Sequence, residues 1–148
     1  GLSAYGLINH RHTSEIEQVA SLISGNKIEL LFTPHLVPIS RGMHSTIYGR
    51  LRDPGLTSED CRILLDNYYR KFKNIKVLPV DTYPSTKWVR YTNQILLSVK
   101  VDTRNGRIII VSVIDNLLKG QTGQAIQNLN LMSGLPLDDG LDLTNNFP

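Results

Sequence analysis

Apolar residues recur every three or four positions near the start of the chain, which predicts a helix over residues 13–24. They share one face of that helix: Ile16, Val19, Ala20 and Ile23. Thr13 or Ser14 is the expected N-cap, and the spacing of Ser14 and Glu17 fits a capping box. Gly25 is the expected end, because glycine readily adopts the left-handed conformation that follows many helices.

The clearest helical pattern covers residues 58–72, with Thr57 as the expected N-cap. Its apolar positions fall on one face: Cys61, Leu64, Leu65, Tyr68 and Phe72. The pattern places the single cysteine on the buried side, where a thiol has a raised pKa and is inert. That cysteine is therefore not a predicted nucleophile. A third helix is expected over residues 122–133, ended by Gly134 and Pro136.

Shorter apolar runs separated by turn residues predict the strands. They are expected at residues 27–33, 45–51, 76–79, 94–101 and 107–114, with a further extended piece between Pro34 and Pro38. Asn105 and Gly106 join the last two strands as a hairpin, and residues 81–93 form a long polar loop. The run Ile108–Ile114 is almost wholly apolar, which is typical of a central strand covered on both faces. Short turns favour an α+β fold with a mixed, mostly antiparallel sheet and helices on one face.

Length and composition indicate a single globular domain over residues 1–148, with a loose polar tail at residues 138–148. The basic excess is 16 − 13 = 3 charges, and its scatter argues against a nucleic-acid partner. No apolar run has the length of a membrane span, so no membrane partner is expected. A single cysteine excludes an internal disulfide and fits a reducing compartment.

The strongest chemical lead is a histidine pair on either side of Arg11. If residues 8–12 are extended, His10 and His12 point to the same side, because side chains alternate along a strand. Two imidazoles just before a helix N-terminus could move a proton next to an anion. The residues leave three interpretations open: a catalytic base, half of a metal site, or ordinary strand histidines. No cysteine pair or carboxylate cluster completes a ligand set, so no metal is expected.

Two further segments carry cations suited to a carboxylate or phosphate. Lys87 and Arg90 lie in the loop Ser85–Asn93, and Arg41 stands in a turn beside Gly42. Solvated surface loops share this composition, so both interpretations stay open.

The turn from Lys119 to Gln124 leads from the last strand into the third helix. It has neither the spacing of a phosphate-binding P-loop nor a G-x-G-x-x-G dinucleotide fingerprint. The turn is either a plain strand-to-helix connection or a place where free backbone N–H groups face a ligand.

Five stretches together resemble the N-acetyl-gamma-glutamyl-phosphate reductases, enzymes of arginine biosynthesis. They run in order along nearly the whole chain: Tyr5–Gln18, Phe32–Arg41, Thr82–Arg90, Asp115–Asn128 and Asn130–Gly140. The resemblance implies the C-terminal substrate-binding and dimerisation domain, with the α+β fold found in glyceraldehyde-3-phosphate and aspartate-semialdehyde dehydrogenases. Two positions depart from the family pattern: Ser14 replaces a proline, and Tyr91 stands where glycine is usual.

The resemblance also implies a reaction. The family reduces N-acetyl-L-glutamyl 5-phosphate to N-acetyl-L-glutamate 5-semialdehyde with NADPH, through a thioester on a cysteine. NADP is bound mainly by an N-terminal Rossmann domain. Neither its glycine fingerprint nor the catalytic cysteine motif occurs in this sequence, so we expect a truncated part of a longer gene product, inactive by itself.

Residue roles follow from the same resemblance. His10, and after it His12, is the expected catalytic base. The expected substrate-binding residues are Tyr5, Arg11, Glu15, Arg41, Lys87 and Arg90. The expected contacts to the nicotinamide end of the cofactor are Gly120, Gly123, Gln124 and Asn128.

The expected partners are a small-molecule substrate and further copies of the chain. The apolar strand Ile108–Ile114 and its hairpin favour a sheet that continues across a two-fold interface, giving a homodimer or homotetramer. The bacterial cytoplasm or the plastid stroma is the expected compartment. The competing hypotheses are a purely structural dimerisation module, whose histidines are incidental, and a basic RNA- or ligand-binding domain.

Overall fold

The computed structural model describes residues 1–142, and the chain divides into two compact units where the sequence predicted one domain. One unit is Gly1–Ser40, and the other begins at Arg41. Each is described by itself. Within residues 1–142, no helix combines the length and apolar character needed to cross a bilayer.

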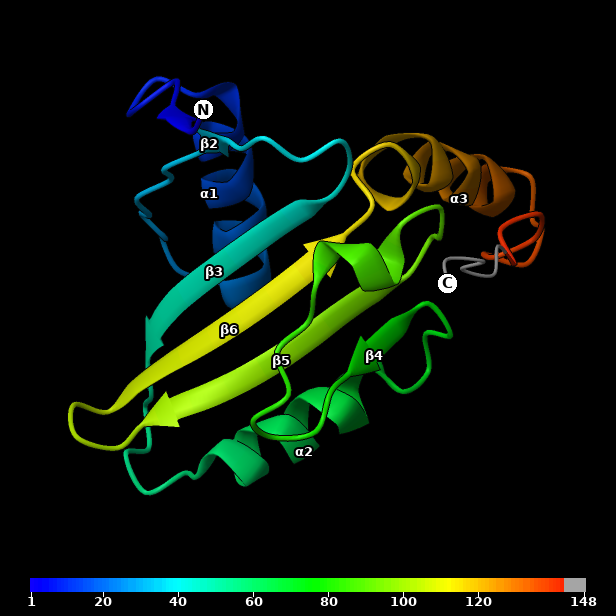
Figure 1. The fold of residues 1–148 in the computed structure, drawn as a ribbon. Helices are drawn as coiled ribbons and strands as arrows, with labels where there is room; N and C mark the ends of the chain where they lie inside the picture. Colours follow the sequence, from blue (N-terminus) through cyan, green and yellow to red (C-terminus); the bar gives the residue numbers. More distant parts are fainter. Residues whose placement is uncertain (143–148) are drawn as a thin grey trace. The chain divides into compact units, whose positions relative to one another are not determined.

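The second unit is built on a four-stranded sheet in the order β3-β6-β5-β4 (Figure 1). Its strands are β3 (Met43–Arg50), β4 (Ile75–Val77), β5 (Ile95–Asp102) and β6 (Arg107–Ile114). Neighbouring strands are antiparallel except for β4 and β5, which are parallel. The sheet is therefore mixed and mostly antiparallel, and the predicted α+β class is confirmed.

β6 is central, as predicted, and pairs along its whole length with β3 and β5. It is not covered on both faces, however: Val113 is fully buried, whereas the other apolar residues of the strand keep partial exposure. On one face, Ile108 and Ile110 pack against the core beneath α2. On the other, Val113 packs with Val89 and Leu96, at one end of the strand only.

Helix α2 (Ser58–Tyr69) packs on β4 and β5 (Figure 1) and begins as predicted at Thr57. The Thr57 side chain accepts the Asp60 N–H while the Asp60 carboxylate accepts the Thr57 N–H, which completes a capping box. Cys61 is buried, as predicted, but Leu64 and Tyr68 of the predicted apolar face are exposed. A helix that meets two strands on one side buries a narrower stripe than the sequence pattern suggests.

Three further elements complete this unit. The loop predicted at residues 81–93 contains a short 3₁₀ helix, η1 (Thr86–Val89), whose Val89 is fully buried. A π-helical turn, η2 (Leu118–Thr122), leads into α3 (Gly123–Met132), close to the predicted third helix.

Part of the predicted loose tail is fixed against α3. The Asn130 side chain donates to the carbonyls of Leu137 and Asp139, and Leu141 is buried. The remainder of that tail, residues 143–148, lies outside the described residues.

The first unit holds α1 (Arg11–Ser24) and a two-residue pairing of β1 (Ser3–Ala4) with β2 (His35–Leu36). The predicted strand at residues 27–33 is wrong. The backbone N–H groups of Ile28 and Leu30 donate to the side chains of Ser21 and Glu17 on α1, so they take no strand partner. Short apolar runs form strands only where a partner strand is available.

Candidate functional site

The histidine pair lies at the start of α1, but its geometry differs from the prediction. Arg11 is the first helical residue, so residues 8–12 are not an extended strand, and neither Thr13 nor Ser14 is the N-cap. His10 takes that place: its Nδ1 accepts the His12 backbone N–H at 3.2 Å. An imidazole ring is an unusual cap, which explains why the usual residue preferences missed it.

The two imidazoles nevertheless lie together, with ring centroids 4.7 Å apart. Aromatic rings surround His10: Tyr5 lies edge-on at 5.3 Å, and Phe32 lies edge-on at 5.2 Å. Tyr5 was predicted here, whereas Phe32, 20 positions along the chain from His12, carried no local signal. On the other side, Glu15 lies 3.9 Å from His12 Nε2.

The cap bond constrains the chemistry of His10. An Nδ1 that accepts a hydrogen bond carries no proton, so the neutral ring holds its proton on Nε2. His10 in this arrangement can therefore donate a hydrogen bond from Nε2. His12 makes no such bond through Nδ1 within the described part of the chain, and its ring is partly exposed.

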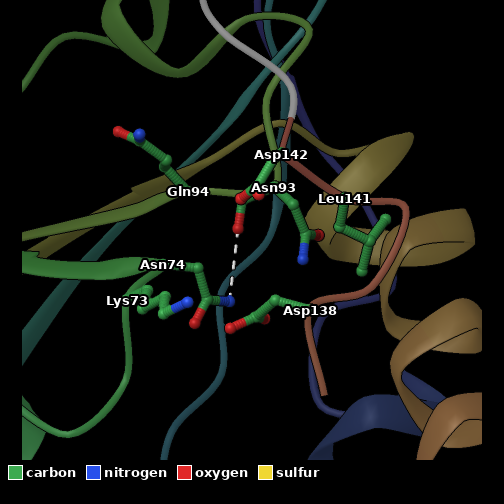
Figure 2. A pocket seen from close by; sticks show the side chains of 7 residues that line it. All are labelled: Lys73, Asn74, Asn93, Gln94, Asp138, Leu141 and Asp142. Carbon is green, nitrogen blue, oxygen red and sulfur yellow. Dashed lines mark hydrogen bonds between the residues drawn. The ribbon is translucent and has the colours of Figure 1, made fainter. Parts of the chain in front are cut away.

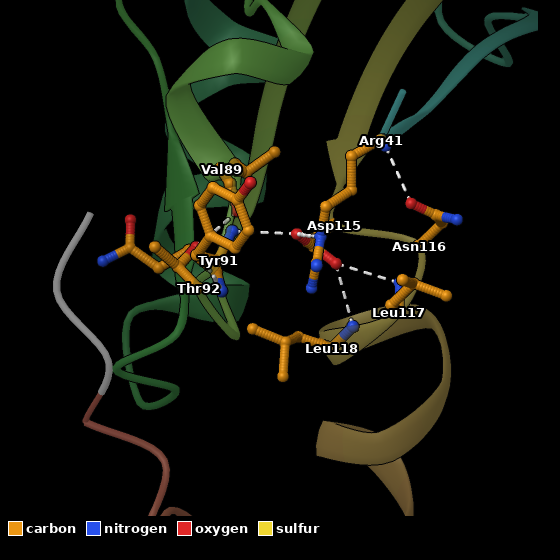
Figure 3. A network of polar contacts seen from close by, with 10 residues as sticks. Arg41, Val89, Tyr91, Thr92, Asp115, Asn116, Leu117 and Leu118 are labelled. Carbon is orange, nitrogen blue, oxygen red and sulfur yellow. Dashed lines mark hydrogen bonds and ion pairs between the residues drawn. The ribbon is translucent and has the colours of Figure 1, made fainter. Parts of the chain in front are cut away.

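A second polar centre lies in the other unit, around the buried carboxylate of Asp115 at the end of β6 (Figure 3). Its Oδ2 accepts the Arg41 Nε–H at 2.6 Å and the Tyr91 backbone N–H at 2.8 Å. Its Oδ1 accepts the backbone N–H groups of Leu117 and Leu118, both at 2.9 Å. The sequence analysis named Arg41 but missed Asp115.

Electrostatics at this centre follow from those bonds. Burial by itself would raise the pKa of Asp115, but the Arg41 guanidinium and three backbone N–H donors outweigh it and lower that pKa. The same pair raises the pKa of Arg41. The Arg41 guanidinium also lies over the Tyr91 ring, 4.6 Å from its centroid.

The two other predicted cations lie on a segment next to Arg41. Lys87 lies within η1 and is exposed, and Arg90 follows that helix and is half-buried. Gly42 connects this segment to Arg41: a Cβ there would lie 2.6 Å from the Thr86 Cβ, and its φ of +117° favours glycine. The structure thus brings the predicted anion-binding residues of the second unit to one end of the sheet.

The turn predicted to contact the cofactor does not offer the free backbone N–H groups that one interpretation of the sequence expected. The N–H groups of Gly120, Thr122 and Gly123 donate to the carbonyls of residues 115, 117 and 118, five positions earlier. These groups are not free for a ligand, because the π-helical turn uses them.

Side chains at this turn remain accessible. Gln124 and Asn128 are exposed, and their amides face each other at 3.4 Å. Lys119 donates to Gln124 at 2.8 Å, and to the buried Gln127, which the sequence analysis missed, at 2.5 Å. Burial lowers the pKa of Lys119, and Asp138 opposes that shift.

A cavity of about 250 Å³ lies between the start of β5 and the segment that follows α3 (Figure 2). It is lined by Lys73, Asn74, Asn93, Gln94, Asp138, Leu141 and Asp142. The Asn93 side chain is buried, and neither its Nδ2 nor its Oδ1 has a hydrogen-bond partner among the described residues. No three His, Cys, Asp or Glu side chains within residues 1–142 are grouped so that they could hold a metal ion.

Comparison with protein families gives one match over most of the chain. The family described as semialdehyde dehydrogenase, dimerisation domain, matches residues 1–116. The match includes the histidine pair, Arg41, Tyr91 and Asp115.

Curated relatives extend the likeness to the full chain. An N-acetyl-gamma-glutamyl-phosphate reductase of Prochlorococcus marinus strain MIT 9301 is 91% identical over all 148 residues. The corresponding reductase of strain MIT 9211 is 61% identical over 147 residues, 99% of this chain. The chain spans only 42% and 41% of the length of these two relatives.

A solved structure supports the fold. The crystal structure of aspartate semialdehyde dehydrogenase II from Vibrio cholerae, complexed with ASA, superposes with a TM-score of 0.66 at 18% identity. The match covers 84% of this chain and 37% of that one. At this identity the likeness concerns the fold alone.

Proposed function

Because the chain belongs to the semialdehyde dehydrogenase dimerisation-domain family, we propose that it forms the substrate-binding and dimerisation part of an N-acetyl-gamma-glutamyl-phosphate reductase. The observation that carries this proposal is 91% identity, over every residue of the chain, to a reductase of that name. The full-length enzyme would reduce N-acetyl-L-glutamyl 5-phosphate to the 5-semialdehyde. Its relatives are bacterial, which supports the bacterial cytoplasm over the plastid stroma.

The cofactor of this reaction is NADPH, which supplies a hydride when it is bound. This chain offers it the exposed side-chain amides of Gln124 and Asn128, groups that suit the carboxamide of a nicotinamide. The backbone of the adjoining turn is already hydrogen-bonded, so side chains would make the contact. Most of the cofactor would be held by a domain outside this chain.

The histidine pair would handle the protons. His10, fixed by its cap bond with the proton on Nε2, would donate a hydrogen bond from Nε2 to a substrate oxygen as negative charge develops on it. His12, in ring contact with it and close to Glu15, would accept a proton and act as the base for the cysteine thiol. We therefore propose His12 as the base, whereas the resemblance pointed to His10 first. Tyr5, Arg11 and Glu15 remain proposed neighbours of the substrate.

The anionic groups of the substrate call for fixed cations. Arg41, held by Asp115, lies next to the segment with Lys87 and Arg90. These three are the proposed partners for the carboxylate and the phosphoryl group, because guanidinium and ammonium groups make charge-assisted bonds to both.

The proposal is tested in a full-length reductase in which this chain replaces the segment that it matches in the strain MIT 9301 relative. The assay follows phosphate-dependent reduction of NADP⁺ by N-acetylglutamate semialdehyde. We expect turnover from the full-length protein and none from the isolated chain. A full-length protein without turnover would overturn the proposed function and favour a purely structural module.

Histidine variants of the same protein test the proton roles. His10→Asn and His12→Asn are each expected to lower kcat/KM by about a hundredfold or more, as for loss of an oxyanion hydrogen-bond donor and of a general base, respectively. Asparagine is a good N-cap, so His10→Asn keeps α1 capped and isolates the chemical role. If both variants are as active as the wild type, the family assignment stands and the proposed roles of the histidines are wrong.

A further inference from the structure

The Asp115 carboxylate fixes the position of three separate segments. It joins the turn at Arg41, the end of the η1 loop at Tyr91 and the start of η2 at Leu117. The carboxylate is fully buried and accepts four hydrogen bonds, so it cannot turn without breaking several of them. Arg41 is therefore held by a rigid partner.

The contact with Asp115 uses only one side of the Arg41 guanidinium. The hydrogen bond to Asp115 runs from the Arg41 Nε, and no hydrogen bond from either terminal nitrogen is found among residues 1–142. The Arg41 side chain is 21% exposed, so it reaches the surface of its unit. The two terminal nitrogens of a guanidinium form the planar fork that binds carboxylate or phosphate through two parallel bonds.

Tyr91 also contacts Arg41, because the guanidinium carbon lies over the Tyr91 ring (Figure 3). Its φ of +61° lies in the left-handed region, which is unfavourable for a residue with a Cβ. In that conformation its N–H donates to Asp115 while its ring lies under Arg41. Backbone strain that serves one contact to the Asp115 carboxylate and one to its guanidinium partner is typical of a functional position.

We propose that Asp115 and Tyr91 are positioning residues for Arg41, whose two terminal nitrogens receive an oxyanion of the substrate. That oxyanion is the phosphoryl group or the carboxylate of the acyl phosphate. The inference rests on the proposed function, which supplies the substrate. A guanidinium that is already fixed loses little conformational entropy when it binds an oxyanion. Asp115 and Tyr91 therefore increase the affinity of Arg41 for that oxyanion by fixing its position beforehand.

The test measures two KM values in the full-length reductase carrying this chain, one for inorganic phosphate and one for N-acetylglutamate semialdehyde. Tyr91→Leu removes the ring, and we expect it to raise one of these KM values about two- to fivefold, with kcat within about twofold of the wild type. Tyr91→Phe keeps the ring and is expected to restore the wild-type KM. A rise for phosphate assigns the phosphoryl group to Arg41, and a rise for the semialdehyde assigns the carboxylate.

Asp115→Asn and Arg41→Lys extend the series. Both are expected to raise the same KM by about tenfold or more, because the fork is lost or no longer fixed. Asp102→Asn is the matched control: Asp102 also pairs with an arginine, Arg104, but at the opposite end of the same sheet. It should leave both KM values unchanged. Circular dichroism of each variant shows whether the fold is retained.

The outcomes separate the inference from the function on which it rests. If the wild type is active but Tyr91→Leu and Arg41→Lys keep both KM values, the positioning role is wrong and the reductase assignment stands. A fall in kcat with both KM values unchanged would likewise overturn it. If the wild type has no turnover, the proposed function fails and the inference fails with it.

Discussion

At the scale of single residues, Asp115 is a buried charge that the fold stabilises through several donors at once. An isolated ionised carboxylate is costly to bury. Here one guanidinium and three backbone N–H groups replace water, and together they hold the pKa of Asp115 below its ordinary value of 3.8. The ionised form is therefore the one that the folded state prefers.

This preference predicts how stability depends on pH. A carboxyl whose pKa is lower in the folded than in the unfolded chain stabilises the fold above the unfolded pKa, and that contribution is lost as pH falls through the folded pKa. Asp115→Asn removes the titrating group. We expect the free energy of unfolding to fall less steeply below about pH 4 in Asp115→Asn than in the wild type.

Urea unfolding of the chain at a series of pH values from 7 to 3 measures this difference. Asp102→Asn serves as a comparison, because the Asp102 carboxylate is less buried than that of Asp115. The Arg104 guanidinium also lowers the pKa of Asp102, but solvent screens this exposed pair, so the acid limb of Asp102→Asn should lie between those of the wild type and Asp115→Asn. Parallel acid limbs for Asp115→Asn and the wild type would contradict the role assigned to the Asp115 charge.

At the scale of elements, the junction of η2 and α3 depends on one glycine. A Cβ at Gly123 would lie 2.2 Å from the Asn93 Oδ1 and 3.0 Å from the Leu118 carbonyl oxygen. Gly123→Ala is expected to destabilise the fold by about 1–3 kcal/mol, since the start of α3 must shift away from the loop before β5. Thermal unfolding measures the change.

A double mutant shows whether Asn93 is the cause. The Asn93 amide has no hydrogen-bond partner among the described residues, so Asn93→Ala should cost little by itself and should recover part of the loss from Gly123→Ala. Gly120→Ala is the matched control, because its nearest neighbour, the Ile114 Cδ1, would lie at an ordinary 3.4 Å. Additive effects of Asn93→Ala and Gly123→Ala would rule out the contact.

Elements with strong local signals were predictable from the sequence. The capping residues of α2 and the turn of the β5–β6 hairpin lie within a few positions of the element that they define. The strand predicted at residues 27–33 failed because its N–H groups are taken by α1 side chains, 7 and 13 positions away. The start of α1 failed because a histidine ring is an uncommon cap.

Of the polar centre around Asp115, the sequence predicted only the cation Arg41 as a candidate site residue. Arg41 and Asp115 are 74 positions apart, and no local pattern marks two residues that meet only when the sheet is complete. The sequence pattern singled out the histidine pair and the resemblance to a family favoured a catalytic base, but the tautomer of His10 follows from a contact that only the structure describes.

At the scale of the whole molecule, the described residues of the second unit, 41–142, leave one face of its sheet partly uncovered. α2 covers β4 and β5 from one side, and η1 reaches the other side only near Val113. Along β3 and β6, the pairs Tyr48–Ile109 and Thr46–Val111 point to that second side, and Tyr48 is 69% exposed. Exposed apolar faces of this kind mark contacts between proteins, and the family is one of dimerisation domains.

We therefore expect the chain to form a homodimer or homotetramer through this face, and neighbouring residues of β3 offer a matched test. Tyr48 and Ile47 are adjacent and point to opposite faces, and both are more than half exposed. Tyr48→Lys should shift the chain toward monomer in analytical ultracentrifugation, because a buried unpaired ammonium opposes association. Ile47→Lys adds the same charge on the other face and should leave the oligomer intact. If Ile47→Lys dissociates the oligomer and Tyr48→Lys does not, the interface lies on the α2 side of the sheet. A wild type that stays monomeric at high protein concentration would contradict self-association of the chain.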